Sequence, residues 1–162
     1  MVDEARRLAD DAQNQPQSNP YPDGKHRLKT ACAGSLLHDG VLTVHSSSTA
    51  TGGSTTHPHP AMQGILDQVE RDLTAENQPT GTGHGKCAEI SLISDRLHQI
   101  DPTGTKITTP AQVQEAMRGS LVYSLQIGDL RPGEGQLFHG DYKPPCRSCS
   151  RVLPLAGVTA HH

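Results

Sequence analysis

The chain has 162 residues, of which 33% are hydrophobic and only 2% are aromatic, and its formal net charge is −3. This length suits one domain with a single core, which Leu, Ile, Val and Ala must fill because aromatic residues are so few. The small negative charge excludes a general attraction to a phosphate backbone, so any nucleic-acid contact must come from local groups.

The N-terminal stretch is charged, and it lacks the apolar segment of a secretory signal. No run in the chain reaches the length of a membrane span, so we expect no membrane contact. Residues 2–13 predict a short helix, and the Gln-, Asn- and Pro-rich stretch up to Gly24 predicts a linker. The chain therefore divides into a helix and linker segment, residues 1–24, and one domain, residues 25–162. Two interpretations of the helix stay open: it packs on the domain, or it belongs to an upstream part of a larger polypeptide.

The first half of the domain predicts a hairpin followed by a helix. Residues 28–37 and 41–44 flank an Asp-Gly pair typical of a β-turn between two strands. A Ser/Thr/Gly-rich loop follows and ends at His57 and His59. The proline between these histidines argues against a metal site, and we expect a loop near the mouth of the pocket. Pro60 then begins an amphipathic helix whose apolar stripe faces the core: Met62, Ile65, Leu66, Val69 and Leu73.

The second half predicts two helices that begin at cysteines, with a strand between them. Residues 87–99 form a helix that is apolar on most sides, so we expect it to lie buried beneath a sheet. Thr109 and Gln112 predict a capping box on a short helix that ends at Gly119. Residues 120–127 predict a central strand, residues 146–153 a second cysteine helix, and residues 158–160 a last short strand.

Two short motifs indicate the chemistry of a site. Cys87-Ala88-Glu89 is followed downstream by Pro145-Cys146-x-x-Cys149, the order and spacing typical of zinc-dependent nucleobase deaminases with cysteine in place of the histidine ligand. If Cys87 and Cys146 each begin a helix, with Cys149 one turn further on, the three sulfurs can converge on one Zn²⁺ ion. Three protein ligands leave a fourth position open for the water that zinc activates.

The residues around these cysteines suggest further roles. Glu89 is placed to act as general base and then general acid, passing a proton to the ring nitrogen and the leaving amine. His84 is a candidate substrate contact or, equally, a solvated loop residue. We expect compensating cations near the metal, and Lys86, Arg147 and Arg151 are candidates for that role. Two interpretations of Lys143, Arg147 and Arg151 stay open: a basic rim beside the metal, or scattered surface charge. Cys32 lies in a predicted strand, where we expect a buried core thiol.

The runs GHGKCAEISLISDRL (residues 83–97) and YKPPCRSC (residues 142–149) resemble the YwqJ-type deaminase domains found at the C-terminal end of bacterial polymorphic toxins. The resemblance extends over residues 25 to 160. It implies a cytidine-deaminase-like α/β fold, with three α/β/α layers, a central mixed sheet and one zinc ion at two helix N-termini. It also implies a delivered toxin that acts in the cytoplasm of a target cell, and a cognate immunity protein. By the same resemblance, the backbone N–H of Ala88 helps to hold the base beside the metal.

The predicted function is therefore hydrolytic deamination of a nucleobase, with cytosine in single-stranded DNA or RNA as the leading substrate. Free nucleosides or nucleotides, and adenine, stay open as alternatives. A hypothesis of another class is a non-catalytic module in which the three cysteines, with or without His84, close a structural zinc site. A thiol redox protein is a weaker alternative, because it leaves Cys87-Ala88-Glu89 unexplained.

Overall fold

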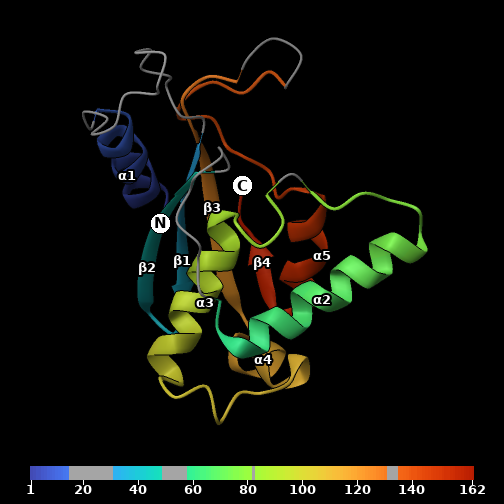
Figure 1. Ribbon diagram of the computed structural model, residues 1–162. Helices are drawn as coiled ribbons and strands as arrows, with labels where there is room; N and C mark the ends of the chain where they lie inside the picture. Colours follow the sequence, from blue (N-terminus) through green and yellow to red (C-terminus); the bar gives the residue numbers. More distant parts are fainter. Residues whose placement is uncertain (15–30, 49–57, 82, 131–134) are drawn as a thin grey trace, which may run out of the picture.

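The computed structural model describes residues 1–14, 31–48, 58–81, 83–130 and 135–162 (Figure 1). The predicted linker and most of the loop that contains His57 lie outside these residues. The helices described are α1 (Val2–Asn14), α2 (Pro60–Ala75), α3 (Ala88–Ile100), α4 (Pro110–Ala116) and α5 (Arg147–Leu155), and the strands are β1 (Ala31–His38), β2 (Val41–Ser48), β3 (Ser120–Ile127) and β4 (Val158–Ala160).

The four strands form one mixed sheet in the order β2-β1-β3-β4. The hairpin turn at Asp39 and Gly40 joins β1 to β2, and both residues have positive φ, as a tight hairpin requires. β1 also pairs antiparallel with β3, so that Gly34 lies opposite Ser124, whereas β3 and β4 run parallel. β3 therefore lies inside the sheet, which confirms the central position predicted for it.

Helices cover both faces of the sheet, which gives the three-layer α/β/α arrangement expected from the sequence. On one face α1 packs through Ala9 against Ala33 and Ile127. On the other face α3 lies across β1, β2 and β3, while α5 contacts β4 and α2 (Figure 1). The N-terminal helix is thus a packed element of this fold.

The main core lies between the sheet and the helices of the α3 face. It is aliphatic, as the composition requires, and the stripe predicted on α2 is buried in it together with Leu92, Ile93 and Leu97 of α3. Gly34 allows the closest approach, because a Cβ atom there would lie 2.8 Å from Leu92 Cδ1 and 3.3 Å from Ala88 Cβ. The first turn of α3 is therefore pressed against β1, and this contact fixes the start of the helix.

The prediction for His59 was wrong. His59 is fully buried rather than part of a loop at the pocket mouth. Its Nδ1 accepts the Ala61 N–H at the start of α2, and its Nε2 lies 3.7 Å from the Asp101 carboxylate beyond the C-terminal end of α3. The imidazole is held here because it caps one helix and meets the carboxylate that follows another, a tertiary contact that local sequence does not indicate. No described helix is long and apolar enough to cross a membrane.

Candidate metal and catalytic site

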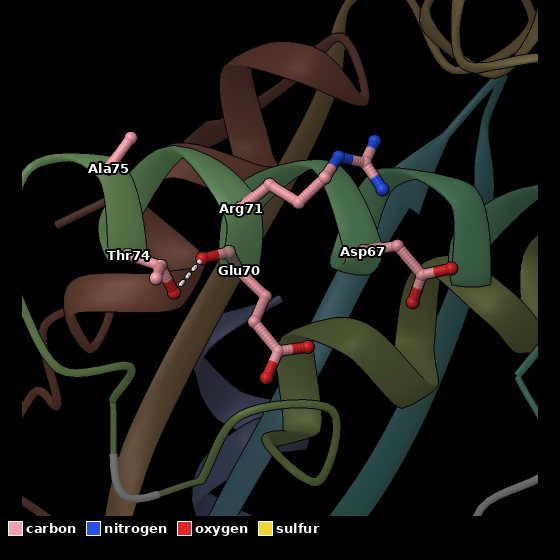
Figure 2. Close-up of a pocket in the computed structure, with 5 residues that line it drawn as sticks. All are labelled: Asp67, Glu70, Arg71, Thr74 and Ala75. Atoms are coloured by element: carbon pink, nitrogen blue, oxygen red, sulfur yellow. Dashed lines mark hydrogen bonds between the residues drawn. The ribbon is translucent and has the colours of Figure 1, made fainter.

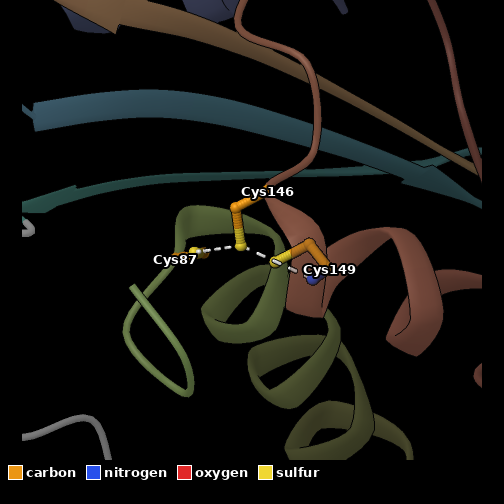
Figure 3. Close-up of side chains that lie close together, drawn as sticks. All are labelled: Cys87, Cys146 and Cys149. Carbon is orange, nitrogen blue, oxygen red and sulfur yellow. Dashed lines mark hydrogen bonds between the residues drawn. The ribbon is translucent and has the colours of Figure 1, made fainter. Parts of the chain in front are cut away.

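Two helix N-termini bring three cysteines together (Figure 3). Cys87 is the N-cap of α3 and Cys146 is the N-cap of α5, while Cys149 lies in the first turn of α5. Their sulfur atoms all lie within 4.8 Å of one another, and Cys87 Sγ is 3.5 Å from Cys146 Sγ. The unsatisfied N–H groups at helix N-termini favour negative charge, and Cys146 Sγ accepts the Cys149 N–H at 3.5 Å. The group is therefore placed where thiolates are stabilised.

The loop before α3 is anchored to the start of α5. Gly81 donates its N–H to Ser148 Oγ at 2.8 Å, and Arg147 Nη1 donates to the Pro79 carbonyl at 3.1 Å. A Cβ atom on Gly81 would lie only 2.7 Å from Cys146 Sγ, so the backbone passes directly over that sulfur. Cys87 Sγ also lies 3.1 Å from the carbonyl oxygen of Gly83. These contacts fix the two cysteine-bearing segments relative to each other.

The three thiols share their protons unequally. The pKa of Cys146 is lowered because its thiolate accepts hydrogen bonds from the thiols of Cys149 and Cys87. The pKa values of Cys87 and Cys149 are raised, first because each would lose its bond to Cys146 by ionising, and then by burial and neighbouring negative charge. Without a cation the group thus favours one thiolate and two thiols. A divalent cation can take the place of the two remaining protons.

The donor set fits a zinc ion. Tetrahedral coordination with Zn–S bonds of about 2.3 Å requires sulfurs roughly 3.8 Å apart, close to the spacing observed here. Within the part of the chain that the structure describes, no fourth histidine, cysteine or acidic side chain joins the three sulfurs. The three cysteines could therefore hold zinc with one coordination position left to a non-protein ligand.

Glu89 lies in the first turn of α3 beside this group. Its side chain is 3% exposed, and Oε2 is 3.9 Å from Cys149 Sγ. Burial raises the pKa of Glu89, and the negative charge of Cys146 adds to this, while the ammonium of Lys143 acts in the opposite direction. A buried carboxyl group with a raised pKa, directly beside a metal-type donor set, is suited to moving protons.

Polar residues of β3 face the same site, and the sequence analysis missed them. Ser124 Oγ is buried near Ala88 across Gly34, and it is close enough to the Glu89 carboxyl for a hydrogen bond that lowers the pKa of Glu89. Gln126 is fully buried, and its Oε1 accepts a hydrogen bond of 2.7 Å from Lys143 Nζ. The available signal was a serine and a glutamine two positions apart in an otherwise apolar strand, which places both on one face.

The structure separates the basic residues that the sequence grouped around the cysteines. Arg147 bonds to the Pro79 carbonyl, and Arg151 pairs with Glu76 on the exposed side of α5 through bonds of 3.1 and 2.6 Å. Lys143 is the cation whose charge acts on Glu89. These two arginines therefore brace the loop that follows α2, which differs from the role of compensating cation beside the metal.

Two other predicted residues can be placed. His84 lies in the turn before α3, outside the cysteine group, and its Nδ1 is buried without a hydrogen-bond partner among the described residues. Cys32 is 2% exposed in β1, which agrees with the expected core thiol, and it does not join the cysteine group. His84 thus has a buried ring nitrogen without a partner, three residues before Cys87 in the chain. Cys32 lies outside the group of three cysteines.

An open hollow lies elsewhere, on the outer face of α2 (Figure 2). The hydrogen bond drawn there joins the hydroxyl of Thr74 to the carbonyl of Glu70 at 2.8 Å. Its lining is an exposed helix surface with charged residues of both signs: Asp67, Glu70, Arg71, Thr74 and Ala75. None of these residues is part of the cysteine group, so the hollow is a feature of the surface and not of the site.

An α/β/α sandwich with a cysteine group at two helix N-termini, and a buried glutamate beside it, defines a protein of the deaminase class. The model of the YwqJ-like deaminase family matches residues 23–158 of the chain. The chain therefore belongs to the YwqJ-like deaminase family. Comparison with curated proteins and with solved structures gave no significant match.

Proposed function

We propose that this chain is a zinc-dependent hydrolytic deaminase of a nucleobase, with cytosine in single-stranded DNA or RNA as its substrate. Glu89 carries the proposal, because its buried carboxyl group lies beside three converging cysteines. A structural zinc site has no need of such a group, and it takes four protein ligands where the described residues bring three together.

Each residue of the site has a proposed role. Cys87, Cys146 and Cys149 would hold the zinc, which when bound supplies a water of lowered pKa as the nucleophile. Glu89 would take one proton from the nucleophilic water and deliver it to the ring nitrogen, and would then carry the proton of the hydroxyl formed on the attacked carbon to the amine, so that a carbonyl forms as the C–N bond breaks and ammonia leaves. The Ala88 N–H and His84 are proposed contacts to the base, and the buried hydroxyl of Ser124 is available for the same purpose. The closely packed first turn of α3 excludes bulk water from the carboxyl group.

The biological setting is part of the same proposal. Family membership supports a toxin domain that is delivered into a target cell, acts in its cytoplasm and is neutralised by a cognate immunity protein in the producing cell. A domain boundary near residue 24 is also proposed, and it is supported by a family match that begins at residue 23.

The test is direct. Purified, zinc-loaded protein and its Glu89→Ala variant would be incubated with single-stranded DNA, double-stranded DNA, RNA, and free nucleosides and nucleotides. Replacement of an amine by a carbonyl adds about one dalton to the base, which mass spectrometry detects. We expect this gain in a cytosine-containing strand with the native protein and not with the variant. Full zinc occupancy with no mass gain in any substrate would argue for the structural zinc module.

A further inference from the structure

The segment that approaches α5 pairs with the end of β3 and forms one wall beside the site. Gly140 N–H donates to the Gln126 carbonyl, Gln126 N–H donates to the Asp141 carbonyl, and Lys143 N–H donates to the Ser124 carbonyl, all at 2.8 to 2.9 Å. Side chains along this segment therefore alternate between the two faces of the sheet. Tyr142 lies on the α1 face, where it packs in the cluster of Tyr123 and Leu125, so Lys143 lies on the face of α3 and the cysteines.

Lys143 is held in place without neutralisation of its charge. Its Nζ donates to Gln126 Oε1 at 2.7 Å, and Gln126 is fixed in turn because its Nε2 donates to the carbonyls of Ile127 and Gly128. No ion pair of Lys143 with a carboxylate occurs among the described residues, although its charge acts on Glu89. A half-buried ammonium with unused donors, bonded to a neutral amide, suits a phosphate group.

Phe138 presents an exposed ring near the end of β3, where Gln126 and Lys143 lie. It is the one phenylalanine of the chain and is 62% exposed. Its N–H donates to Asp141 Oδ2 at 2.8 Å, and its carbonyl accepts the Asp141 N–H. The next residue, His139, accepts the Gly128 N–H and lies 3.0 Å from the carboxylate of Asp10. The ring therefore extends from an anchored turn, and stacking on a base would cover it at little cost in ordering.

The position of Phe138 separates it from the other exposed apolar side chains. Among the described residues these are Val41, Leu42 and Val44 of β2. Val41 and Leu42 adjoin the hairpin turn, at the opposite end of the sheet from the start of β1 and the cysteines. Phe138 is thus the exposed large apolar residue, among those described, whose turn adjoins the end of β3 where Gln126 and Lys143 lie.

We propose that residues 135–145 form the binding surface for a single nucleic-acid strand. Phe138 stacks on a base that flanks the target, and Lys143 contacts a phosphate of the same strand. This inference rests on the proposed function and deepens it, because it names the residues that hold the strand beside the target base. One aromatic ring can stack on one flanking base, which agrees with the small aromatic content of the chain.

The test measures binding separately from turnover. A fluorescently labelled single-stranded oligonucleotide with one cytosine is titrated into zinc-loaded Glu89→Gln protein, and its anisotropy is followed at several salt concentrations. Stacking of one base is worth about 1–3 kcal/mol, so Phe138→Ala should weaken binding by roughly 5- to 150-fold. Lys143→Met should reduce the slope of log affinity against log salt by about 1, whereas Lys143→Arg should keep it. Leu42→Ala is the matched control, an exposed apolar residue distant from the site, and should bind like its parent.

The outcomes separate the two proposals. Equal oligonucleotide affinity in the parent, Phe138→Ala and Lys143→Met proteins would overturn the inference. So would rapid deamination of free cytidine by a native enzyme that does not bind oligonucleotides, although the deaminase chemistry assigned to Glu89 and the cysteines would then stand. If no substrate is deaminated, the proposed function fails, and the binding result still decides whether this surface holds a strand. Thermal unfolding of each variant identifies any loss of affinity that comes from loss of the fold.

Discussion

The two ends of α3 differ in how their buried polar groups are satisfied. Beyond the C-terminal end, the Asp101 carboxylate accepts the N–H groups of Thr105, Lys106 and Ile107 and the hydroxyl of Thr103. These bonds satisfy the carboxylate and lower the pKa of Asp101, while the neighbouring His59 Nε2, 3.7 Å away, has no hydrogen-bond partner among the described residues. The carboxylate satisfies the backbone of the turn that follows the helix, so its physical role is stability.

At the N-terminal end of α3 the described buried polar groups are not held in a comparable set of hydrogen bonds. Its buried groups include a glutamate with a raised pKa, three thiols that share protons, and the unpartnered Nδ1 of His84. Such groups cost free energy unless a ligand satisfies them. One helix thus has a carboxylate satisfied by hydrogen bonds at one end and a group of thiols with a buried glutamate at the other, and the latter end is where the proposed chemistry takes place.

Removal of a sulfur ligand from the cysteine group should have the largest effect. Cys149 is fully buried, and Cys149→Ser should lose most of its zinc and all deaminase activity, since loss of a direct ligand exceeds the roughly 10- to 100-fold effect of an outer contact. Zinc content measured by mass spectrometry of the metal checks this. Cys32→Ala, a buried cysteine outside the group, should keep one equivalent, and full zinc in Cys149→Ser would contradict the assignment.

Removal of the proton-transfer group should come next. Glu89→Gln keeps the size of the side chain and removes its acid–base function, so kcat/KM should fall by about 10²- to 10⁴-fold with zinc content unchanged. Asp95→Asn is the matched control, because Asp95 lies further along α3, where it is part-exposed and pairs with His45. A Glu89→Gln enzyme with native kcat/KM would remove the catalytic role.

A methyl group placed over the cysteines should have an intermediate effect. Gly81→Ala would bring Cβ to 2.7 Å from Cys146 Sγ, which must displace the sulfur or the loop, and we expect a loss of zinc affinity of roughly 10- to 100-fold. In Gly64→Ala the new Cβ has room, because the nearest side-chain atom, Pro110 Cγ, is 4.0 Å away. That helical change should leave zinc affinity unchanged and add about 0.5–1 kcal/mol to stability. Competition with a chelator of known affinity measures the zinc affinity of both variants. Equal zinc affinities would show that the loop can move away from Cys146 at little cost.

Substitution of Asp101, beyond the C-terminal end of α3, should change the stability of the fold alone, and the size of the change should depend on pH. The pKa of Asp101 is lower in the folded than in the unfolded chain, so its carboxylate stabilises the fold above its unfolded pKa, about 3.9. This contribution is lost as the pH falls through the lower, folded pKa. Asp101→Asn should therefore lower the melting temperature by several degrees at pH 7 and by much less in acid. Thermal unfolding of metal-free, reduced protein at several pH values across this range checks it, and a difference in melting temperature that does not change with pH would contradict the linkage.

The regular elements and the cysteine group could be predicted because their signals are local. Cys146 and Cys149 are spaced i, i+3 on one helix, so the sequence fixes their proximity once the helix forms. The capping box predicted from Thr109 and Gln112 is present, since both hydrogen bonds lie within one turn. The strand at residues 120–127 has the predicted bounds because its apolar run is ended by glycines on both sides.

The surroundings of the site depend on contacts between segments that are far apart in the sequence, and these could not be predicted. Lys143 lies beside β3 only because its backbone bonds to Ser124, and Gln126 then holds its ammonium. Arg151 could not be assigned because its partner, Glu76, is 75 residues away in the chain. His59 was misplaced for the same reason, since its environment consists of Ser94 and Asp101. Motif spacing identifies the centre of the site, and tertiary register decides its surroundings.

The cysteine group also joins two distant parts of the chain. An ion bound by the three sulfurs would link Cys87 to Cys146 and so close a loop of the chain that contains α3, α4 and β3. Because such an ion binds the folded chain, it acts as a clip, and free zinc at 100 times its dissociation constant would add about 2.7 kcal/mol to the stability of the fold. The concentration of free zinc would then determine how readily the chain unfolds. Any process that pulls the chain through a narrow opening would have to strip the ion first, and refolding would be completed only where zinc can be captured again.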